Sequence, residues 1–172
     1  FCVQSDLPET VHGGQQRVCP RRDVLLNSIR SFVGDGAAYV WGSNFRNHMG
    51  LGPNAANEIF QPTLIPELSE ATIVHMCLED INSVALNNRG VLYVWGPDKH
   101  PVPFFGDQDQ LKDKVCIDVS PSYRGGFHVL TADGQIYCGS YGVLSQIPTD
   151  SLPAQPYKVY SVRSCGLLVQ TS

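Results

Sequence analysis

The sequence predicts an all-β fold of the propeller type, because one short strand pattern returns three times along the chain. The copies are Gly36-Ala-Ala-Tyr39-Val-Trp41-Gly42, Gly90-Val-Leu-Tyr93-Val-Trp95-Gly96 and, more weakly, Gly134-Gln-Ile-Tyr137-Cys138-Gly139. The leading glycines are 54 and then 44 residues apart. A period of about 40–50 residues built from short strands is typical of propeller blades rather than of one compact globule.

The composition fits many short strands and argues against two classes of partner. Hydrophobic residues make up 42% and charged residues 16% of the 172 residues, and the chain has 16 glycines and 12 prolines. The formal net charge of -4 lacks the basic excess that broad binding to phosphate backbones needs, so we expect no direct binding of nucleic acid. No apolar run approaches the roughly 20 residues of a membrane helix, so we expect no membrane insertion.

The six cysteines favour a reducing, intracellular compartment. They are widely spaced, without any Cys-x-x-Cys motif, and three of them (Cys77, Cys116 and Cys138) sit in apolar segments. In such segments a thiol behaves as a small hydrophobe. The even count leaves disulfides open, but a chain of this length does not need them. We expect an intracellular protein and do not distinguish nucleus, cytoplasm and organelle, since the chain begins with Phe and a targeting signal can be missing.

Each copy of the pattern forms the second half of a predicted hairpin. A large apolar residue stands four positions before each turn glycine and a tyrosine three positions after it, which fixes the register across the turn. The three apolar residues are Phe32, Leu86 and Leu130. Proline-marked loops then lead to short apolar strands at residues 73–76, 115–119 and 159–162. We expect isolated helical turns at Glu58–Phe60 and Asp109–Lys114.

This spacing divides the chain into a tail or linker, residues 1–23, and a partial propeller, residues 24–172. The predicted repeats are residues 24–61, 62–100, 101–147 and an incomplete unit, 148–172. The chain stops where the next turn glycine is due, so about three four-stranded blades are expected. Three blades leave open strand edges, which proteins usually cover. We therefore expect the rest of the polypeptide or a partner to complete the ring.

The segment Trp41-Gly-Ser-Asn44-x-x-Asn47-His48-Met-Gly50-Leu-Gly52 resembles the repeat signature of the regulator of chromosome condensation family. Leu130-Thr-Ala-Asp-Gly134 is similar to the family's turn motif, and the resemblance covers about residues 24–172. It implies part of a seven-bladed propeller. The residues that carry the repeat signature are Gly36, Tyr39, Trp41, Gly42, Asn44, Gly50, Gly52, Gly90, Tyr93, Trp95, Gly96, Gly134 and Tyr137.

Departures from that signature predict a divergent member of the family. The family places a histidine ahead of the strands that end at Leu86 and Leu130, where this chain has Asn82 and Gly126. The third copy also replaces Trp-Gly by Gly139-Ser140. Loops that carry function in other members therefore cannot be assumed to do so here.

No pattern in the sequence predicts a catalytic centre, a cofactor or a metal site. The five histidines are dispersed without ligand spacing, and we interpret His75 and His128 as partnered structural residues. Asp35 and Asp133 invite a hypothesis of paired acids, but turn positions before glycine explain them better. The recurring Tyr-x-Trp pairs favour a core between blades over an aromatic binding stripe.

These observations favour a non-enzymatic module that binds other macromolecules, either as a scaffold or as a subunit of a larger assembly. The family resemblance implies an alternative, a guanine-nucleotide exchange factor or regulator for a small GTPase. A propeller hydrolase is favoured least, because no acidic, histidine or arginine side chain recurs at matching blade positions. We expect protein partners, a small GTPase or the subunits of a large complex. The candidate partner-binding loop is Phe45, Arg46, Asn47 and His48, which we expect to be exposed.

Overall fold

The computed structural model describes residues 2–4, 29–34, 36–78, 81–97, 99–106, 108–122, 125–140, 143–162 and 166–171. Within these ranges, the side chains of 2–4, 29–34, 162 and 166 are outside the description. The predictions about Asp35 and most of the tail at residues 1–23 therefore lie outside the described residues. One part of that tail is described, because residues 2–4 form a strand rather than an unstructured linker.

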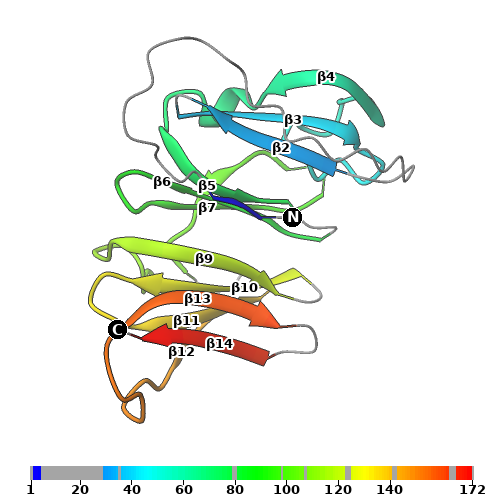
Figure 1. The fold of residues 1–172 in the computed structure, drawn as a ribbon. Helices are drawn as coiled ribbons and strands as arrows, with labels where there is room; N and C mark the ends of the chain where they lie inside the picture. The colour runs from blue at the N-terminus through cyan, green and yellow to red at the C-terminus, as the bar shows by residue number, and fades with distance from the viewer. Residues whose placement is uncertain are drawn as a thin grey trace.

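The described chain folds into four antiparallel sheets that, apart from β1, follow one another along the sequence (Figure 1). Their strand orders are β2-β3-β4, β1-β5-β6-β7-β8, β12-β11-β10-β9 and β13-β14. The strands are β1 Cys2–Gln4, β2 Ile29–Gly34, β3 Ala37–Ser43, β4 Glu58–Leu64, β5 Ile73–Cys77, β6 Ser83–Asn87, β7 Leu92–Trp95, β8 Val102–Pro103, β9 Cys116–Ser122, β10 Gly126–Thr131, β11 Ile136–Ser140, β12 Val143–Ile147, β13 Pro156–Val162 and β14 Gly166–Thr171. We call the sheets the first, second, third and fourth blades. The predicted all-β, blade-by-blade architecture is confirmed.

The hydrophobic core is divided into layers between consecutive blades. One cluster joins the first and second blades and contains Val40, Met49 and Trp95. A second joins the second and third blades, where Phe104 and Phe127 meet edge-on with ring centroids 5.6 Å apart. A smaller cluster joins the third and fourth blades. The second and third blades are therefore stabilised mainly by the burial of both faces against their neighbours, and the first and fourth blades by the burial of one face.

Side-chain alternation along the strands decides which layer each residue enters. In β7, Leu92 and Val94 pack toward the third blade, whereas Tyr93 and Trp95 pack toward the first. This is the period of two that a strand imposes on its two faces. The interpretation of Tyr93 and Trp95 as core between blades is thereby confirmed.

The three turn glycines touch the beginning of the next blade, which explains why they recur. Gly36, Gly90 and Gly134 have φ of 81°, 78° and 79°, a region that favours glycine. The carbonyl of Gly36 accepts a hydrogen bond from the N–H of Ile73 at 2.8 Å. The carbonyl of Gly90 accepts one from the N–H of Cys116 at 3.0 Å. The turn of one blade therefore fixes where the first paired strand of the next begins, namely β5 after Gly36 and β9 after Gly90.

Of the two predicted turns, the one at Glu58–Phe60 is wrong, and the one at Asp109–Lys114 is present as turns rather than as a helix. Glu58–Phe60 is the beginning of β4, since its backbone pairs with the end of β3. Asp109–Lys114 forms consecutive hydrogen-bonded turns, and the described 3₁₀ helix is η1, Pro66–Leu68. β4 also runs to Leu64, beyond the predicted end of the first repeat at residue 61. Local sequence gave no sign of the partner strand that decides the conformation of this segment.

The cysteines of the apolar strands do not all behave as predicted. Cys77 is disulfide-bonded rather than a free thiol, and β1 lies beside it with Cys2 opposite Cys77 in the strand register. The pairing of β1 with β5 joins segments far apart in the chain, so the spacing of the cysteines could not predict it. Cys116 is a free, buried thiol, and burial raises its pKa to about 11. Such a thiol stays protonated and unreactive, as the interpretation as a small hydrophobe requires.

We predict that Gly90→Ala destabilises the chain more than Gly134→Ala. A Cβ at Gly90 would lie 2.5 Å from Cγ1 of Val115 and 2.9 Å from the backbone of Cys116, whereas at Gly134 the nearest atom, Cγ of Gln155, is 3.3 Å away. Both variants carry the strain of a left-handed residue, and Gly90→Ala adds overpacking against backbone. We expect a loss of about 3 kcal/mol for Gly90→Ala and about 1 kcal/mol for Gly134→Ala in urea unfolding. Equal losses would contradict the docking role of the second turn.

Candidate interaction site

The loop between β3 and β4 is organised by the buried side chain of Asn44. Its Oδ1 accepts a hydrogen bond from the N–H of Met49 at 3.2 Å. Its Nδ2 donates to the carbonyl of Ala56 at 3.1 Å and to Oδ1 of Asn47 at 3.2 Å. Asn44 is 0% exposed, so these bonds are made away from competing water. One side chain therefore joins the beginning, the middle and the end of the loop.

The same loop is attached to the second blade through a backbone carbonyl. The carbonyl of His48 accepts hydrogen bonds from Nε1 of Trp95 at 2.9 Å and from Oγ of Ser83 at 3.1 Å. The side chain of Met49 is fully buried in the same layer as Trp95. We call this contact the Trp95 clamp, defined by His48, Met49, Ser83 and Trp95.

Two glycines allow the loop to approach the second blade this closely. Gly50 and Gly52 have φ of 77° and 83°. A Cβ at Gly50 would lie 2.9 Å from Nε1 of Trp95, and one at Gly52 would lie 2.5 Å from the ring of His100. The ring of His100 is in turn held by Glu67, with Nδ1 and Oε1 2.6 Å apart. The glycine spacing of the loop is therefore required by contact with the next blade.

The four residues of the predicted partner-binding loop do not share one environment. Phe45 is 76% exposed, Arg46 is exposed and Asn47 is half-buried. The prediction that His48 is exposed is wrong, because its side chain is 4% exposed. The chain turns inward at this point, which brings the carbonyl of His48 to the indole N–H of Trp95. The imidazole ring of His48 is buried as a result. Phe45 and Arg46 remain at the surface.

A second exposed aromatic residue was missed by sequence reasoning. Phe60 on β4 is 86% exposed. The pairing register of β3 and β4 shifts between Val40 and Gly42, so β4 carries an irregularity in the segment that includes Phe60. The neighbouring Pro62, which cannot donate a ladder hydrogen bond, was the available signal for an irregular edge strand.

A row of polar contacts joins β5 of the second blade, β9 and β10 of the third blade and β13 of the fourth blade. Nδ1 of His75 lies 3.8 Å from Oδ1 of Asp118, and Oδ2 of Asp118 accepts a hydrogen bond from the N–H of Val159 at 2.9 Å. Nδ1 of His128 lies 2.8 Å from Oγ of Ser161. Both histidines are buried and partnered, as the sequence predicts.

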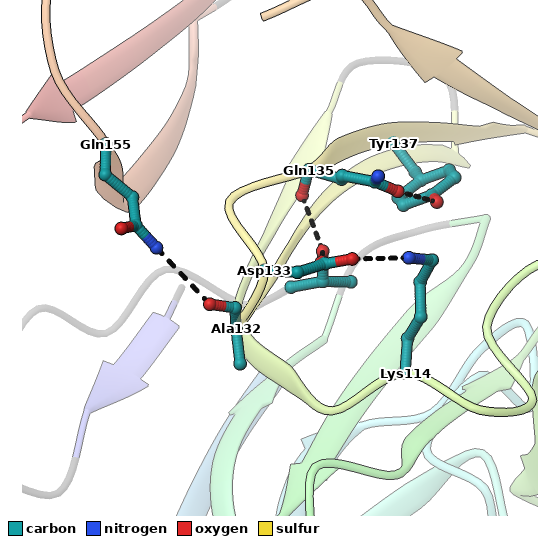
Figure 2. A network of polar contacts seen from close by, with 7 residues as sticks. Lys114, Ala132, Asp133, Gln135, Tyr137 and Gln155 are labelled. Atoms are coloured by element: carbon teal, nitrogen blue, oxygen red, sulfur yellow. Dashed lines mark hydrogen bonds and ion pairs between the residues drawn. The ribbon is translucent and has the colours of Figure 1, made fainter.

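A second polar network holds the turn of the third blade against its neighbours (Figure 2). Asp133 accepts a hydrogen bond from Nζ of Lys114 and another from Oγ1 of Thr131, each at 2.5 Å. Nε2 of Gln155 donates to the carbonyl of Ala132 at 3.3 Å. The bond from Lys114 is the main reason that the pKa of Asp133 is lowered and that of Lys114 is raised. Asp133 is therefore a turn residue held by a lysine.

Asn82, which occupies a position where the family has histidine, also links two blades. Its Nδ2 donates to the carbonyl of Gly125 at 2.5 Å, between the second and third blades. A Cβ at Gly125 would lie 2.6 Å from Cγ2 of Ile81, so the approach is close. Asn82 therefore contributes a contact between the second and third blades of this chain.

Among the residues that the structure describes, no group of three or more His, Cys, Asp and Glu side chains could hold a metal ion. In the same residues, no helix is long and apolar enough to cross a membrane. The polar groups described above serve contacts within the loop and between blades, and the two exposed residues that follow Asn44, Phe45 and Arg46, are aromatic and cationic.

Comparison with known proteins identifies the repeat. Residues 35–86, which contain the Asn44 loop and part of the second blade, match the family model described as regulator of chromosome condensation (RCC1) repeat. This segment of the chain is therefore similar to an RCC1 repeat. The family resemblance that the sequence predicts is therefore confirmed.

Two curated relatives agree with this assignment over a short region. The chain is 34% identical over 62 residues to the RCC1 domain-containing protein RUG3, mitochondrial, of Arabidopsis thaliana. It is 33% identical over 60 residues to protein pim1 of Schizosaccharomyces pombe. These alignments cover 36% and 34% of this chain but 14% and 11% of the relatives.

Solved structures show that the similarity in fold extends over most of this chain. Human WBSCR16 superposes with a TM-score of 0.65 at 13% identity, over 84% of this chain and 42% of that one. Prp20p of Saccharomyces cerevisiae, studied for its binding to Gsp1p and histones, superposes with a TM-score of 0.62 at 16% identity, over 87% and 40%. Yeast RCC1 bound to Kap60 gives 0.63 at 15%, over 96% and 46%. The chain thus has their fold and spans less than half of their length.

We predict that Asn44→Ala destabilises the RCC1 repeat by about 3 kcal/mol, because it leaves the N–H of Met49 and the carbonyl of Ala56 buried without their partner. Asn54→Ala is the matched control, since Asn54 is an exposed asparagine of the same loop. We expect the control to stay within about 0.5 kcal/mol of the parent chain. The measurement is urea unfolding, and similar midpoints for the two variants would contradict the organising role of Asn44.

We predict that the chain loses stability as the pH falls below about 6.5, the ordinary pKa of histidine. Burial lowers the pKa of His75, with a smaller raising effect from Asp118 and a lowering one from Lys158. Burial also lowers the pKa of His128. The unfolded chain therefore binds protons more readily than the folded chain, so stability is fully present above this pH and decreases below it.

The check is the free energy of unfolding measured between about pH 8 and pH 5.5, a range chosen around the ordinary pKa of histidine. The double variant His75→Asn, His128→Asn should show a flatter profile than the parent chain. An unchanged slope in the double variant would assign the pH dependence to other groups.

Proposed function

We propose that this chain is a non-enzymatic protein-interaction module, acting as a scaffold or subunit in a larger intracellular assembly. The observation that carries the proposal is the exposure of Phe45 and Arg46 on a loop whose base is fixed by Asn44 and the Trp95 clamp. The RCC1-type fold supports a binding role, because loops on a rigid propeller can change without disturbing the core.

The chemistry of the exposed residues supports a protein partner. Phenylalanine and arginine are enriched in the buried centres of protein interfaces. Phe45 is 76% exposed and Phe60, on the strand that follows the same loop, is 86% exposed. Binding would remove both aromatic side chains from water. A loop already ordered in the free protein loses little conformational entropy on binding, which favours affinity.

A second candidate function is nucleotide exchange on a small GTPase. The fold shared with Prp20p, which was studied for its binding to Gsp1p and histones, favours it. Against it stand the divergent second and third repeats and the acidic net charge of -4, which support the scaffold. The discriminating assay is the release of labelled GDP from a small GTPase. If the chain is a scaffold, GDP should leave the GTPase at the uncatalysed rate. Faster GDP release in the presence of the chain would favour the exchange factor over the scaffold.

We predict that the double variant Phe45→Ala, Arg46→Ala weakens partner binding by about 30-fold, the effect of removing about 2 kcal/mol from the centre of an interface. The readout is affinity purification with quantitative mass spectrometry, followed by titration of the recovered partner. Tyr157→Ala is the control, because Tyr157 is an exposed aromatic residue on a different blade, 48% exposed. Unchanged affinity for the double variant, with an unchanged unfolding midpoint, would overturn the assignment of the loop.

A further inference from the structure

The disulfide of Cys77 lies at the edge of the second blade, where β1 covers β5. The two strands pair in register, with Cys2 opposite Cys77 and Gln4 opposite His75. Among the described strands, β1 pairs with β5 alone and is the last strand of its sheet. If β1 were released, β5 would therefore become the edge of the second blade.

The strand pairing favours Cys2 as the partner of Cys77 in this disulfide. Cys77 is disulfide-bonded, whereas Cys116 and Cys138 are free thiols. Directly opposite residues of antiparallel strands have Cα atoms about 4.5–5.5 Å apart, a separation that a disulfide spans. β1 has three residues, so few backbone hydrogen bonds hold it on β5. A covalent bond at this position would therefore decide whether β1 stays in place.

The sulfur of Cys77 also faces a histidine that lies beside a carboxylate. Nε2 of His75 is 3.2 Å from Sγ of Cys77, and Nδ1 of the same ring is 3.8 Å from Oδ1 of Asp118. All three side chains are buried. The charge of Asp118 favours the proton on Nδ1, which leaves the lone pair of Nε2 directed at the sulfur. A cysteine next to a histidine that a third group orients is an arrangement that activates thiols.

We propose that Cys2 and Cys77 form a redox-sensitive disulfide, which a dithiol opens and which controls whether β1 covers the edge of β5. One thiolate of the dithiol attacks the sulfur of Cys2, because Cys77 is 0% exposed, and Cys77 leaves as a thiolate. The second thiolate of the dithiol then attacks the mixed disulfide and displaces Cys2. The dithiol loses two electrons and two protons and closes to its own disulfide, and the two cysteines gain both.

His75 stabilises the reduced form of this pair. After the bond opens, Nε2 of His75 can hold the proton of Cys77, which leaves a thiolate beside an imidazolium. Asp118 lies on the other side of that imidazolium and favours its charge. A disulfide whose reduced form is stabilised opens under milder reducing conditions than an unassisted one. Disulfides of intracellular proteins are usually transient, catalytic or redox-sensing, and this site has the chemistry that such a role requires.

Reduction would change the second blade at one edge. The backbone groups of residues 75–77 that face β1 would lose their partners, while those that face β6 would keep theirs. An uncovered strand edge is open to water or to pairing with another strand. The loop that carries Phe45 takes no part in this change, so the inference goes beyond the proposed function and can fail independently of it.

The test is a redox titration of the protein at its natural length in mixtures of reduced and oxidised dithiothreitol. Free thiols are trapped at each ratio, and the peptides that contain positions 2 and 77 are identified by mass spectrometry. We expect a link between Cys2 and Cys77 that opens and closes reversibly. Cys116 is the internal standard, since it is a free thiol and should be trapped at every ratio after denaturation. A link from Cys77 to another cysteine, or none, would overturn the proposal.

The variant His75→Asn tests the part played by the histidine. It should need an about tenfold higher ratio of reduced to oxidised dithiothreitol to open half of the disulfide, because the thiolate loses its partner. His128→Asn is the matched control, since His128 is another buried histidine but contacts Ser161. The control should leave the ratio unchanged. Equal ratios for the two variants would overturn the assignment of His75.

Amide hydrogen exchange tests the release of β1. Exchange at residues 75–77 should become faster on reduction, and equally fast in the oxidised Cys2→Ser variant, because neither has the bond that holds β1. Residues 84–86 of β6 should stay protected in both, since they pair on the other side of β5. Exchange at residues 75–77 that is the same with and without the disulfide would show that the bond does not control the edge.

Discussion

The hydrogen bond from the indole of Trp95 to the carbonyl of His48 joins the second blade to the loop for which we propose a role in partner binding. It fixes the loop of one blade against the body of the next, at 2.9 Å and in a layer from which water is excluded. Asn44 shapes the loop so that this carbonyl points inward. Phe45 and Arg46 are consequently held outward on a short segment whose base is secured from two blades.

Contacts of this kind explain how a chain without a single central core can be ordered. The apolar layers lie between blades, and each one is completed by a turn or loop that crosses to the neighbour. Gly36 and Gly90 set the beginning of the following inner strand, and the network around Asp133 holds the third turn. Loss of one contact between blades should therefore weaken the order of both blades that it joins.

The recurrence of glycine, tyrosine and tryptophan was enough to predict the blades, because that spacing records contacts that repeat from one blade to the next. The exposure of His48 could not be predicted, since it follows from the direction of a carbonyl in three dimensions. Phe60 escaped notice for a similar reason, because its exposure depends on a shift in strand register. The disulfide at Cys77 and the strand at residues 2–4 involve segments far apart in sequence, which spacing within a repeat does not report.

The most direct test of this account is hydrogen exchange at the two indole N–H groups, which NMR resolves because the chain has two tryptophans. We expect the indole N–H of Trp95 to exchange only through large-scale unfolding, with a free energy of opening close to that of global unfolding. The indole N–H of Trp41, which is half-buried, should exchange much faster. Equal, rapid exchange at both positions would show that the loop is not fixed to the second blade, and would contradict the account.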